Sequence, residues 1–389
     1  RAYDVAANHF LEPGDDFARL EWLAGFLALR KLNKPDLALF HFQRHGSAVT
    51  SPISLGRTHY WQGRALEASG KAEAAQAAYT EGAKYQTAFY GLLAAEKAGV
   101  ALSPSLAGTE QFSGWREAPF ARSSVFESGL LLLSADQPRL GVRFLTHLSE
   151  SLDRTEIGQI TGMAEEIGLP YLQLMLAKRG VKYGTVLERP YYPLHPVANQ
   201  VRDVPAELAL AIARRESEFF VDAASGVGAL GLMQLMPPTA KEMAGKLGVP
   251  FSRDRLTTDP SYNAALGVRY LQELIQEFGN SPIQVAAAYN AGPSRPRAWM
   301  QKLGDPRRGQ IDVIDWIEQI PFDETRNYVM RVSESLPVYR ARLNGQLGPV
   351  TFTQELLGKY VPPPAPAAPV VSLRPLVRPA VFSGVPATE

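Results

Sequence analysis

One acidic side chain occurs where the periodicity of the sequence requires an apolar one. Residues 205–220 predict a helix, and the positions on one face of it are Leu208, Ile212, 216, Phe219 and Phe220. That spacing is typical of a stripe that packs into a core. Position 216 is Glu216, and burial raises the pKa of a carboxyl group, which can then act as a general acid near neutral pH. On this segment alone, a structural ion pair with Arg214 or Arg215 is the better explanation.

Segments downstream of Glu216 favour the general acid over the structural ion pair. Residues 225–237 contain three glycines, which predict an irregular backbone that comes close to a ligand or to another part of the chain. Pro237 and Pro238 then predict the start of a helix that stops at Gly248. Residues 286–293 end a short apolar helix, and residues 321–329 begin another helix.

These segments carry motifs in a fixed order. They read Glu-Ser, Gly-Leu-Met-Gln, Ala-Tyr-Asn-Ala-Gly and Glu-Thr-Arg-Asn-Tyr-Val, and each piece alone is typical of a turn, a cap or a core aromatic residue. Together, from about residue 192 to residue 343, they resemble the soluble lytic transglycosylase family, whose catalytic domain has a goose-type lysozyme-like fold. The resemblance implies that Glu216 is the single catalytic acid and base. It implies substrate-binding roles for Ser217, Gly231, Leu232, Met233, Gln234, Tyr289, Asn290, Glu324 and Tyr328.

Within that set, the resemblance implies that Ser217 orients a substrate group and that Met233 and the Gln234 amide lie near the sugar.

One segment departs from the family pattern. The family continues after Ala-Tyr-Asn-Ala-Gly with a glycine and an uninterrupted helix start, whereas residues 293–297 here include Pro293 and Pro296. Because proline restricts itself and the preceding residue, we expect the contacts of this loop to differ.

The number of carboxyl groups bears on the reaction. Ordinary glycoside hydrolysis uses two, but Glu218 lies about 200° around the predicted helix from Glu216, and Glu324 is only a candidate for the second. The resemblance implies a reaction with one glutamate, which cleaves the β-1,4 bond between N-acetylmuramic acid and N-acetylglucosamine without water and leaves 1,6-anhydromuramyl ends, in cell-wall remodelling and turnover. The alternatives are a muramidase that admits water and a scaffold that only holds glycan.

Composition excludes several other classes. The net charge of +1 gives no electrostatic case for nucleic acid or an anionic membrane, and no apolar run approaches the ~18 residues of a transmembrane segment. With no cysteine and six scattered histidines, the sequence predicts neither a metal site nor a cofactor. The absence of cysteine fits the cytoplasm or the periplasm, and the resemblance points to the periplasm. Arg1 looks like the middle of a longer protein.

The remaining sequence predicts an all-α protein. Residues 60–96, and more weakly 21–42, alternate large and small residues like the stacked helix pairs of tetratricopeptide repeats, whose aromatic residues we expect to be core. The predicted domains are a helical superhelix at 1–115, a helical linker domain at 116–190, a lysozyme-like catalytic domain at 191–345 and a Pro-rich tail at 346–389.

The same resemblance and the linker composition give the remaining expectations. The expected partners are peptidoglycan glycan strands and muropeptides, and cell-wall synthesis or remodelling proteins through the superhelix, with the chain a monomer. His195 lies in the Pro-rich linker at 189–196, so we interpret it as a packing or hydrogen-bonding residue and not as a catalytic base. Residues 362–369 predict polyproline II or disorder.

Overall fold

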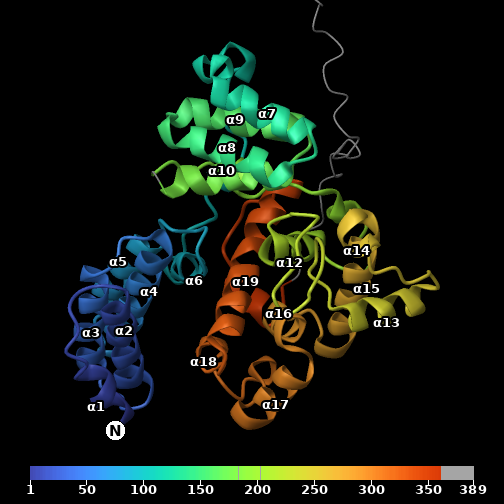
Figure 1. The fold of residues 1–389 in the computed structure, drawn as a ribbon. Helices are drawn as coiled ribbons and strands as arrows, with labels where there is room; N and C mark the ends of the chain where they lie inside the picture. The colour runs from blue at the N-terminus through green and yellow to red at the C-terminus, as the bar shows by residue number, and fades with distance from the viewer. Residues whose placement is uncertain (183, 202, 361–389) are drawn as a thin grey trace, which may run out of the picture. The chain divides into compact units, whose positions relative to one another are not determined.

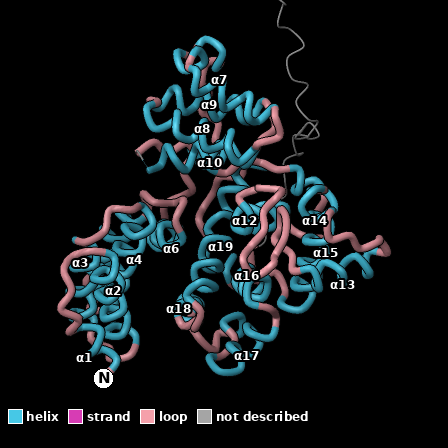
Figure 2. Tube along the Cα trace, viewed as in Figure 1, coloured by secondary structure: helices cyan, strands magenta, loops and turns pink. Residues whose placement is uncertain are grey.

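The computed structural model describes residues 1–182, 184–201 and 203–360, which form helices joined by loops (Figures 1 and 2). These residues form no β-strand, and their extended pairing is limited to two isolated bridges, Ala224 with Leu230 and Leu230 with Leu235. The predicted all-α class is therefore confirmed. The Pro-rich segment 362–369 lies outside the described residues.

The described chain divides into two compact units that do not follow the order of the sequence. Unit 1 comprises residues 1–103, 277–335 and 347–360, and unit 2 comprises residues 104–276 and 336–346. Two long helices, α15 (Pro260–Phe278) and α19 (Asp323–Asn344), continue from one unit into the other. The four domains expected from the sequence stay a prediction.

Unit 1 contains the N-terminal helices and the helices that follow α15. They are α1 (Ala2–Ala7), α2 (Asp15–Arg30), α3 (Pro35–Ser47), α4 (Pro52–Ala68), α5 (Ala72–Gly82), α6 (Phe89–Ala98), α16 (Pro282–Ala291), α17 (Ser294–Leu303), η6 (Pro306–Arg308), α18 (Val313–Glu318) and α20 (Phe352–Leu356). Consecutive helices α2 to α5 pack as neighbours, as expected for stacked helix pairs.

Aromatic side chains fill the interior between these N-terminal helices. Trp61 is fully buried and meets Trp22 and Phe26 edge to face, at 5.9 and 5.4 Å between ring centroids. The ring of Phe42 fits against Gly25, where a Cβ atom would overlap it. Most aromatic residues of the repeat-like segments therefore form a core, as the sequence predicts, whereas Phe40 is 50% exposed.

A buried ion pair connects α4 to α18 within unit 1. The Arg57 guanidinium donates to the Glu318 carboxylate at 2.7 Å, and the Tyr90 hydroxyl donates to the same oxygen. The Glu318 side chain has no exposed surface, and the guanidinium carbon of Arg57 lies 3.5 Å from the centre of the Trp22 ring. Because a buried carboxylate must be compensated, these contacts make α18 dependent on the N-terminal helices.

Unit 2 contains the middle helices and the first part of the motif region. They are η1 (Pro104–Ala107), η2 (Trp115–Glu117), η3 (Pro119–Arg122), α7 (Ser124–Ser134), α8 (Pro138–Leu148), η4 (Ser149–Ser151), α9 (Arg154–Glu166), α10 (Pro170–Lys182), α11 (Glu188–Tyr191), η5 (Pro196–Asn199), α12 (Ala206–Ser217), α13 (Pro237–Leu247) and α14 (Arg255–Thr258).

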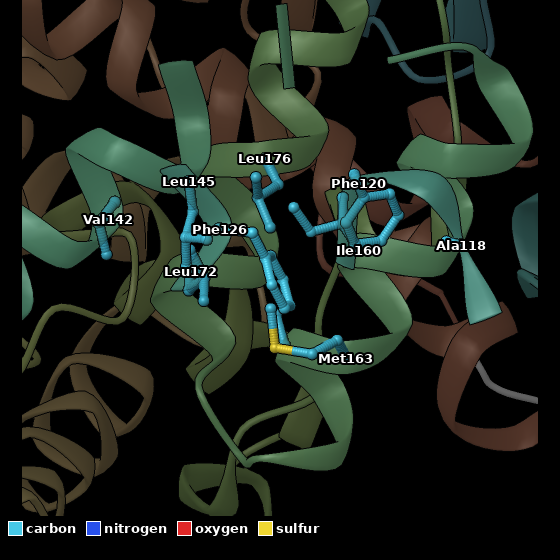
Figure 3. Packing of buried hydrophobic residues seen from close by; sticks show 10 residues of the cluster. Ala118, Phe120, Phe126, Val142, Leu145, Ile160, Met163, Leu172 and Leu176 are labelled. Carbon is cyan, nitrogen blue, oxygen red and sulfur yellow. The ribbon is translucent and has the colours of Figure 1, made fainter. Parts of the chain in front are cut away.

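Helices α7 to α10 share one apolar core. Figure 3 shows Phe126 of α7 and Met163 of α9 among its side chains, with Leu145 from α8 and Leu172 from α10. Leu145 is fully buried and lies against Gly129, where a Cβ atom would overlap its side chain. The missing side chain at Gly129 lets α7 and α8 approach closely.

None of the helices in the described part of the chain is both long enough and apolar enough for a membrane span. Within the same residues, no group of three or more His, Asp or Glu side chains is placed to hold a metal ion.

Candidate active site

Helix α12 carries the glutamate that the sequence singles out. The helix begins after Pro205 and ends at Ser217, and it buries Leu208 and Ile212 as the apolar stripe predicts. Glu216 lies in its last turn and is half-buried. The stripe predicts a fully core-facing carboxyl group, but the chain leaves the helix one residue later, so the end of the stripe is partly open to solvent.

The chain turns sharply directly after α12. Glu218 and Phe219 both have left-handed backbone conformations, with φ of 56° and 69°, which non-glycine residues rarely adopt. The Glu218 carboxylate forms an ion pair with Lys178 of α10. His195 stacks on the Phe219 ring at 5.3 Å and 8° between planes, which fixes the turn.

His195 itself has a structural role. Its Nδ1 accepts a hydrogen bond from the Val197 amide at 3.0 Å, and its side chain is buried. Burial lowers the pKa of His195 to about 4, so the ring is neutral at physiological pH. The interpretation of His195 as a packing and hydrogen-bonding residue is confirmed.

The glycine-containing segment after α12 folds back on itself. The Gly231 amide donates to the carbonyl of Ala223 at 2.7 Å, and Gly231 has φ of 76°. A Cβ atom at Gly231 would overlap the carbonyl oxygen of Leu256 and the side chain of Asn263. The close backbone approach that the glycines predict is confirmed, and the nearby group is another part of the chain.

Two side chains, those of Ser217 and Asn263, hydrogen-bond to the backbone of this segment. The Ser217 hydroxyl donates to the Leu232 carbonyl at 2.6 Å. Asn263, on α15, accepts from the Met233 amide at 2.8 Å and donates to the carbonyls of Leu230 and Leu256, each at 3.0 Å. Both side chains are buried, and together they fix the backbone that follows α12.

Asn263 is the residue that the motif analysis missed. A detectable signal existed, because Asn263 shares the i, i+3, i+4 spacing of one helix face with Leu266 and Gly267. A polar side chain on an apolar face indicates a specific buried hydrogen-bonding role. The same reasoning applied to α12 identifies Glu216.

Three predicted substrate-binding residues have structural contacts of their own. Leu232 and Met233 have no exposed surface, and the Met233 side chain packs against the bare backbone of Gly267. Gln234 has φ of 45°, and its side-chain amide donates to the carbonyls of Ala223 and Gly231 at 3.0 and 2.9 Å. The side chains of Leu232 and Met233 therefore pack in the interior beneath the loop. The side-chain nitrogen of Gln234 is hydrogen-bonded to backbone carbonyls of the loop itself.

The other predicted residues lie in unit 1. Tyr289 and Asn290 are half-buried at the end of α16, and the buried Thr325 hydroxyl donates to the Asn290 side-chain oxygen at 2.7 Å. In the first turns of α19, Glu324 is exposed and Tyr328 is buried. Thr325 thus fixes the orientation of the Asn290 amide.

The proline-containing segment after α16 forms the start of the next helix. Helix α17 begins at Ser294, directly after Pro293, and runs without a break to Leu303. Pro296 falls within the first turn, where an α-helix has no acceptor for the backbone N–H that proline lacks. The two prolines therefore leave the helix start intact, and the expected difference in the contacts of this loop stays a prediction.

Comparisons with known proteins agree with this geometry. The family model described as Transglycosylase SLT domain matches residues 195–310. The chain contains an SLT domain. This domain includes Glu216, the Gly231–Gln234 segment and the end of α16. The chain is also homologous to the soluble lytic murein transglycosylase of Escherichia coli K12, with 44% identity over 140 residues that make up 36% of this chain and 21% of the relative.

Further relatives extend the similarity. A putative soluble lytic murein transglycosylase of Haemophilus influenzae is 35% identical over 173 residues, which cover 44% of this chain and 28% of the relative. The crystal structure of an inactive Glu-to-Gln mutant of the lytic transglycosylase Slt from Pseudomonas aeruginosa has a TM-score of 0.63 and 28% identity, over 83% of this chain and 52% of that one. The 70 kDa soluble lytic transglycosylase of Escherichia coli has a TM-score of 0.62 and 22% identity, over 87% of this chain and 65% of that one. This similarity shows a shared fold.

The chain spans only about a fifth of the length of the first curated relatives that it matches.

Proposed function

We propose that this protein is a peptidoglycan lytic transglycosylase that acts in the periplasm in cell-wall remodelling and turnover. The proposal depends on one observation above all, a half-buried glutamate at the end of α12 followed by a backbone segment fixed by buried hydrogen bonds. An acid in this position, within an SLT domain, is the group that the reaction needs. The homologous proteins named as lytic murein transglycosylases support the same activity.

In the proposed reaction, Glu216 acts first as an acid. Its carboxyl group donates a proton to the glycosidic oxygen between N-acetylmuramic acid and N-acetylglucosamine as the bond from that oxygen to C1 breaks. The acetamido oxygen of the muramic acid stabilises the electron-deficient C1, so no protein nucleophile is needed. This step requires the protonated form of the carboxyl group, which an apolar environment generally favours.

Glu216 then acts as a base. Its carboxylate accepts the proton of the C6 hydroxyl, and O6 bonds to C1 to give a 1,6-anhydromuramyl end. No water is consumed, and the glutamate regains its proton for the next cycle. Because this step competes with hydrolysis, the site must limit the access of water to C1.

The other residues would position the substrate and the loop. We propose that Tyr289, Asn290, Glu324 and the backbone of Gly231 contact the glycan, while Ser217, Leu232, Met233, Gln234 and Tyr328 hold these groups in place. The expected substrates are glycan strands and muropeptides. No step of this reaction uses a metal or a cofactor.

The test is mass spectrometry of the muropeptides released from purified peptidoglycan. Products one water lighter than reducing muropeptides, and resistant to borohydride, are expected. A Glu216→Gln variant should lose at least about 10²–10⁴-fold in turnover, whereas the matched Glu218→Gln variant should stay active. Reducible products would replace the proposal with a muramidase, and bound glycan without any product would replace it with a scaffold.

A further inference from the structure

A polar pocket lies in unit 2 between helix α9 and the segment 104–115. It encloses about 620 Å³, which falls within the range of about 300–1,000 Å³ typical of ligand sites. Residues 187–190, in and beside α11, complete its lining. All of its lining residues belong to unit 2, and none of them belongs to the motifs assigned to the candidate active site. The pocket is therefore a second concave site on the same unit.

Two buried amide side chains present unused acceptors to this pocket. Gln159 and Gln173 line it and are 9% and 3% exposed. The side-chain nitrogen of Gln159 donates to the Ser113 hydroxyl at 2.8 Å, and that of Gln173 donates to the Glu165 carboxylate at 3.1 Å. Within residues 1–182, 184–201 and 203–360, neither side-chain oxygen accepts a hydrogen bond. Because buried polar atoms need partners, these two oxygens call for a donor from outside the chain.

Three carboxylates in the lining are held by arginine side chains. The pairs are Glu110 with Arg154 at 2.6 Å, Glu165 with Arg189 at 2.8 Å and Glu166 with Arg116 at 2.6 Å. Because the charge of these carboxylates is already compensated, a cationic ligand gains little from them. Each carboxylate oxygen can still accept a further hydrogen bond, and its orientation is fixed before a ligand arrives. The lining therefore favours a neutral ligand with many donor groups.

Glycines keep one wall of the pocket open. Gly158 and Gly162 lie one helical turn apart on α9, and both line the pocket. The Phe112 ring packs against Gly158, where a Cβ atom would overlap it. A Cβ atom at Gly162 would meet nothing within 4 Å apart from its own helix, although glycine inside a helix costs about 1 kcal/mol relative to alanine. The space above Gly162 is thus open to a ligand, beside an aromatic ring.

We propose that this pocket binds an N-acetylated sugar of a glycan strand, at a site separate from Glu216. The inference rests on the proposed function, because such sugars make up the proposed substrate. Their hydroxyl and acetamido N–H groups are donors for the Gln159 and Gln173 oxygens and for the fixed carboxylates, and their methyl and ring C–H groups are apolar surface for Phe112. A basic peptide would need uncompensated carboxylates, and three of those in the lining are paired.

Helix α11 connects the pocket to the candidate active site. Its residues 188–190 line the pocket, and the carbonyl of Tyr191 accepts a hydrogen bond from the Arg214 side chain at 3.1 Å. Arg214 lies on α12, two residues before Glu216. A strand held in the pocket stays attached to the unit that carries Glu216, which raises its effective concentration at the site. The pocket should therefore affect KM for long strands more than kcat.

The first test measures binding at the pocket in the full chain with Glu216→Gln, which prevents turnover. The probe is the β-1,4-linked tetramer of N-acetylglucosamine, detected by hydrogen exchange on peptides that cover residues 108–116. At about ten times its half-saturating concentration, the probe should slow exchange in this segment about tenfold. Unchanged exchange overturns the proposal. Cellotetraose has the same linkage without acetamido groups and should slow exchange much less, so an equal effect of the two sugars would overturn the N-acetylated class.

The second test fills the pocket. In the Glu216→Gln chain, Gly162→Leu should abolish the slowing without lowering the melting temperature, because leucine favours a helix more than glycine does. Gly245→Leu is the matched control, since Gly245 is an exposed glycine of α13 that lies outside the pocket and also has open space above it. It should keep the slowing. Slowing that persists in Gly162→Leu would contradict the location of the site.

The third test measures turnover in the active protein. Gly162→Leu should raise KM for long glycan strands about tenfold and leave kcat and the KM for a tetrasaccharide unchanged. An unchanged KM for long strands would overturn the role of the pocket as an anchor. Slowed exchange at residues 108–116 without anhydromuramyl products would overturn the proposed function alone, and products without slowed exchange would overturn the pocket alone.

Discussion

Replacing Asn263 by alanine should loosen the loop that follows α12. The substitution removes three hydrogen bonds of 2.8 to 3.0 Å from a fully buried side chain. At about 1 kcal/mol each, with about 0.5 kcal/mol regained from the better helix propensity of alanine, the loss is roughly 2–3 kcal/mol. The Met233 amide loses its acceptor and should exchange its hydrogen with solvent about thirtyfold to a hundredfold faster.

The measurement is hydrogen exchange by mass spectrometry on peptides that cover residues 230–236, together with turnover of peptidoglycan. Asn327→Ala is the matched control, because Asn327 is an exposed residue of another helix, α19. Asn263→Asp keeps an acceptor for Met233 but places a negative charge against two carbonyls, so it should also destabilise the loop. Unchanged exchange at residues 230–236 in Asn263→Ala would refute the assigned role of this side chain.

Two further predictions concern buried titratable groups. Glu318→Gln should lower stability by about 1–3 kcal/mol, because it removes the carboxylate that pairs with the partly exposed Arg57 guanidinium. Thermal unfolding beside Glu324→Gln, at an exposed position, would detect this loss, and equal melting temperatures would contradict it. Because the pKa of His195 is lowered from 6.5 to about 4 in the folded state, its contribution is fully present above pH 6.5 and is lost as the pH falls toward 4, by an amount on the order of 3 kcal/mol. His195→Gln should flatten the curve of melting temperature against pH between pH 6.5 and about 4. An unchanged slope would argue against a contribution of His195 to this pH dependence.

Local rules predict the boundaries of several elements well. Pro237 and Gly248 delimit α13 as expected, with Gly248 in the left-handed conformation at φ of 68°. The short apolar helix before Gly292 and the helix after Phe322 are also found, as α16 and α19. These features depend on residues within one or two turns, which the sequence displays directly.

Long-range contacts explain what the sequence did not reveal. The motif order indicates a functional role for Ser217. It does not indicate that the Ser217 hydroxyl donates a hydrogen bond to the Leu232 carbonyl, 15 residues away. Similarly, the family resemblance implies that Met233 lies near the sugar, but it does not reveal the complete burial of Met233 against Gly267. Such roles depend on which segments the tertiary fold brings together, and only a polar residue on an apolar face, as at Asn263, gives a local sign of them.

The buried pair of Arg57 and Glu318 also bears on how such a protein can change over evolutionary time. The two residues are 261 positions apart, yet loss of the Arg57 charge would leave the fully buried Glu318 carboxylate without its nearest cation. We expect substitutions at these positions to be inherited together in relatives that share this arrangement. A recombination event that exchanged the N-terminal helices for an unrelated module would have to replace Glu318 as well.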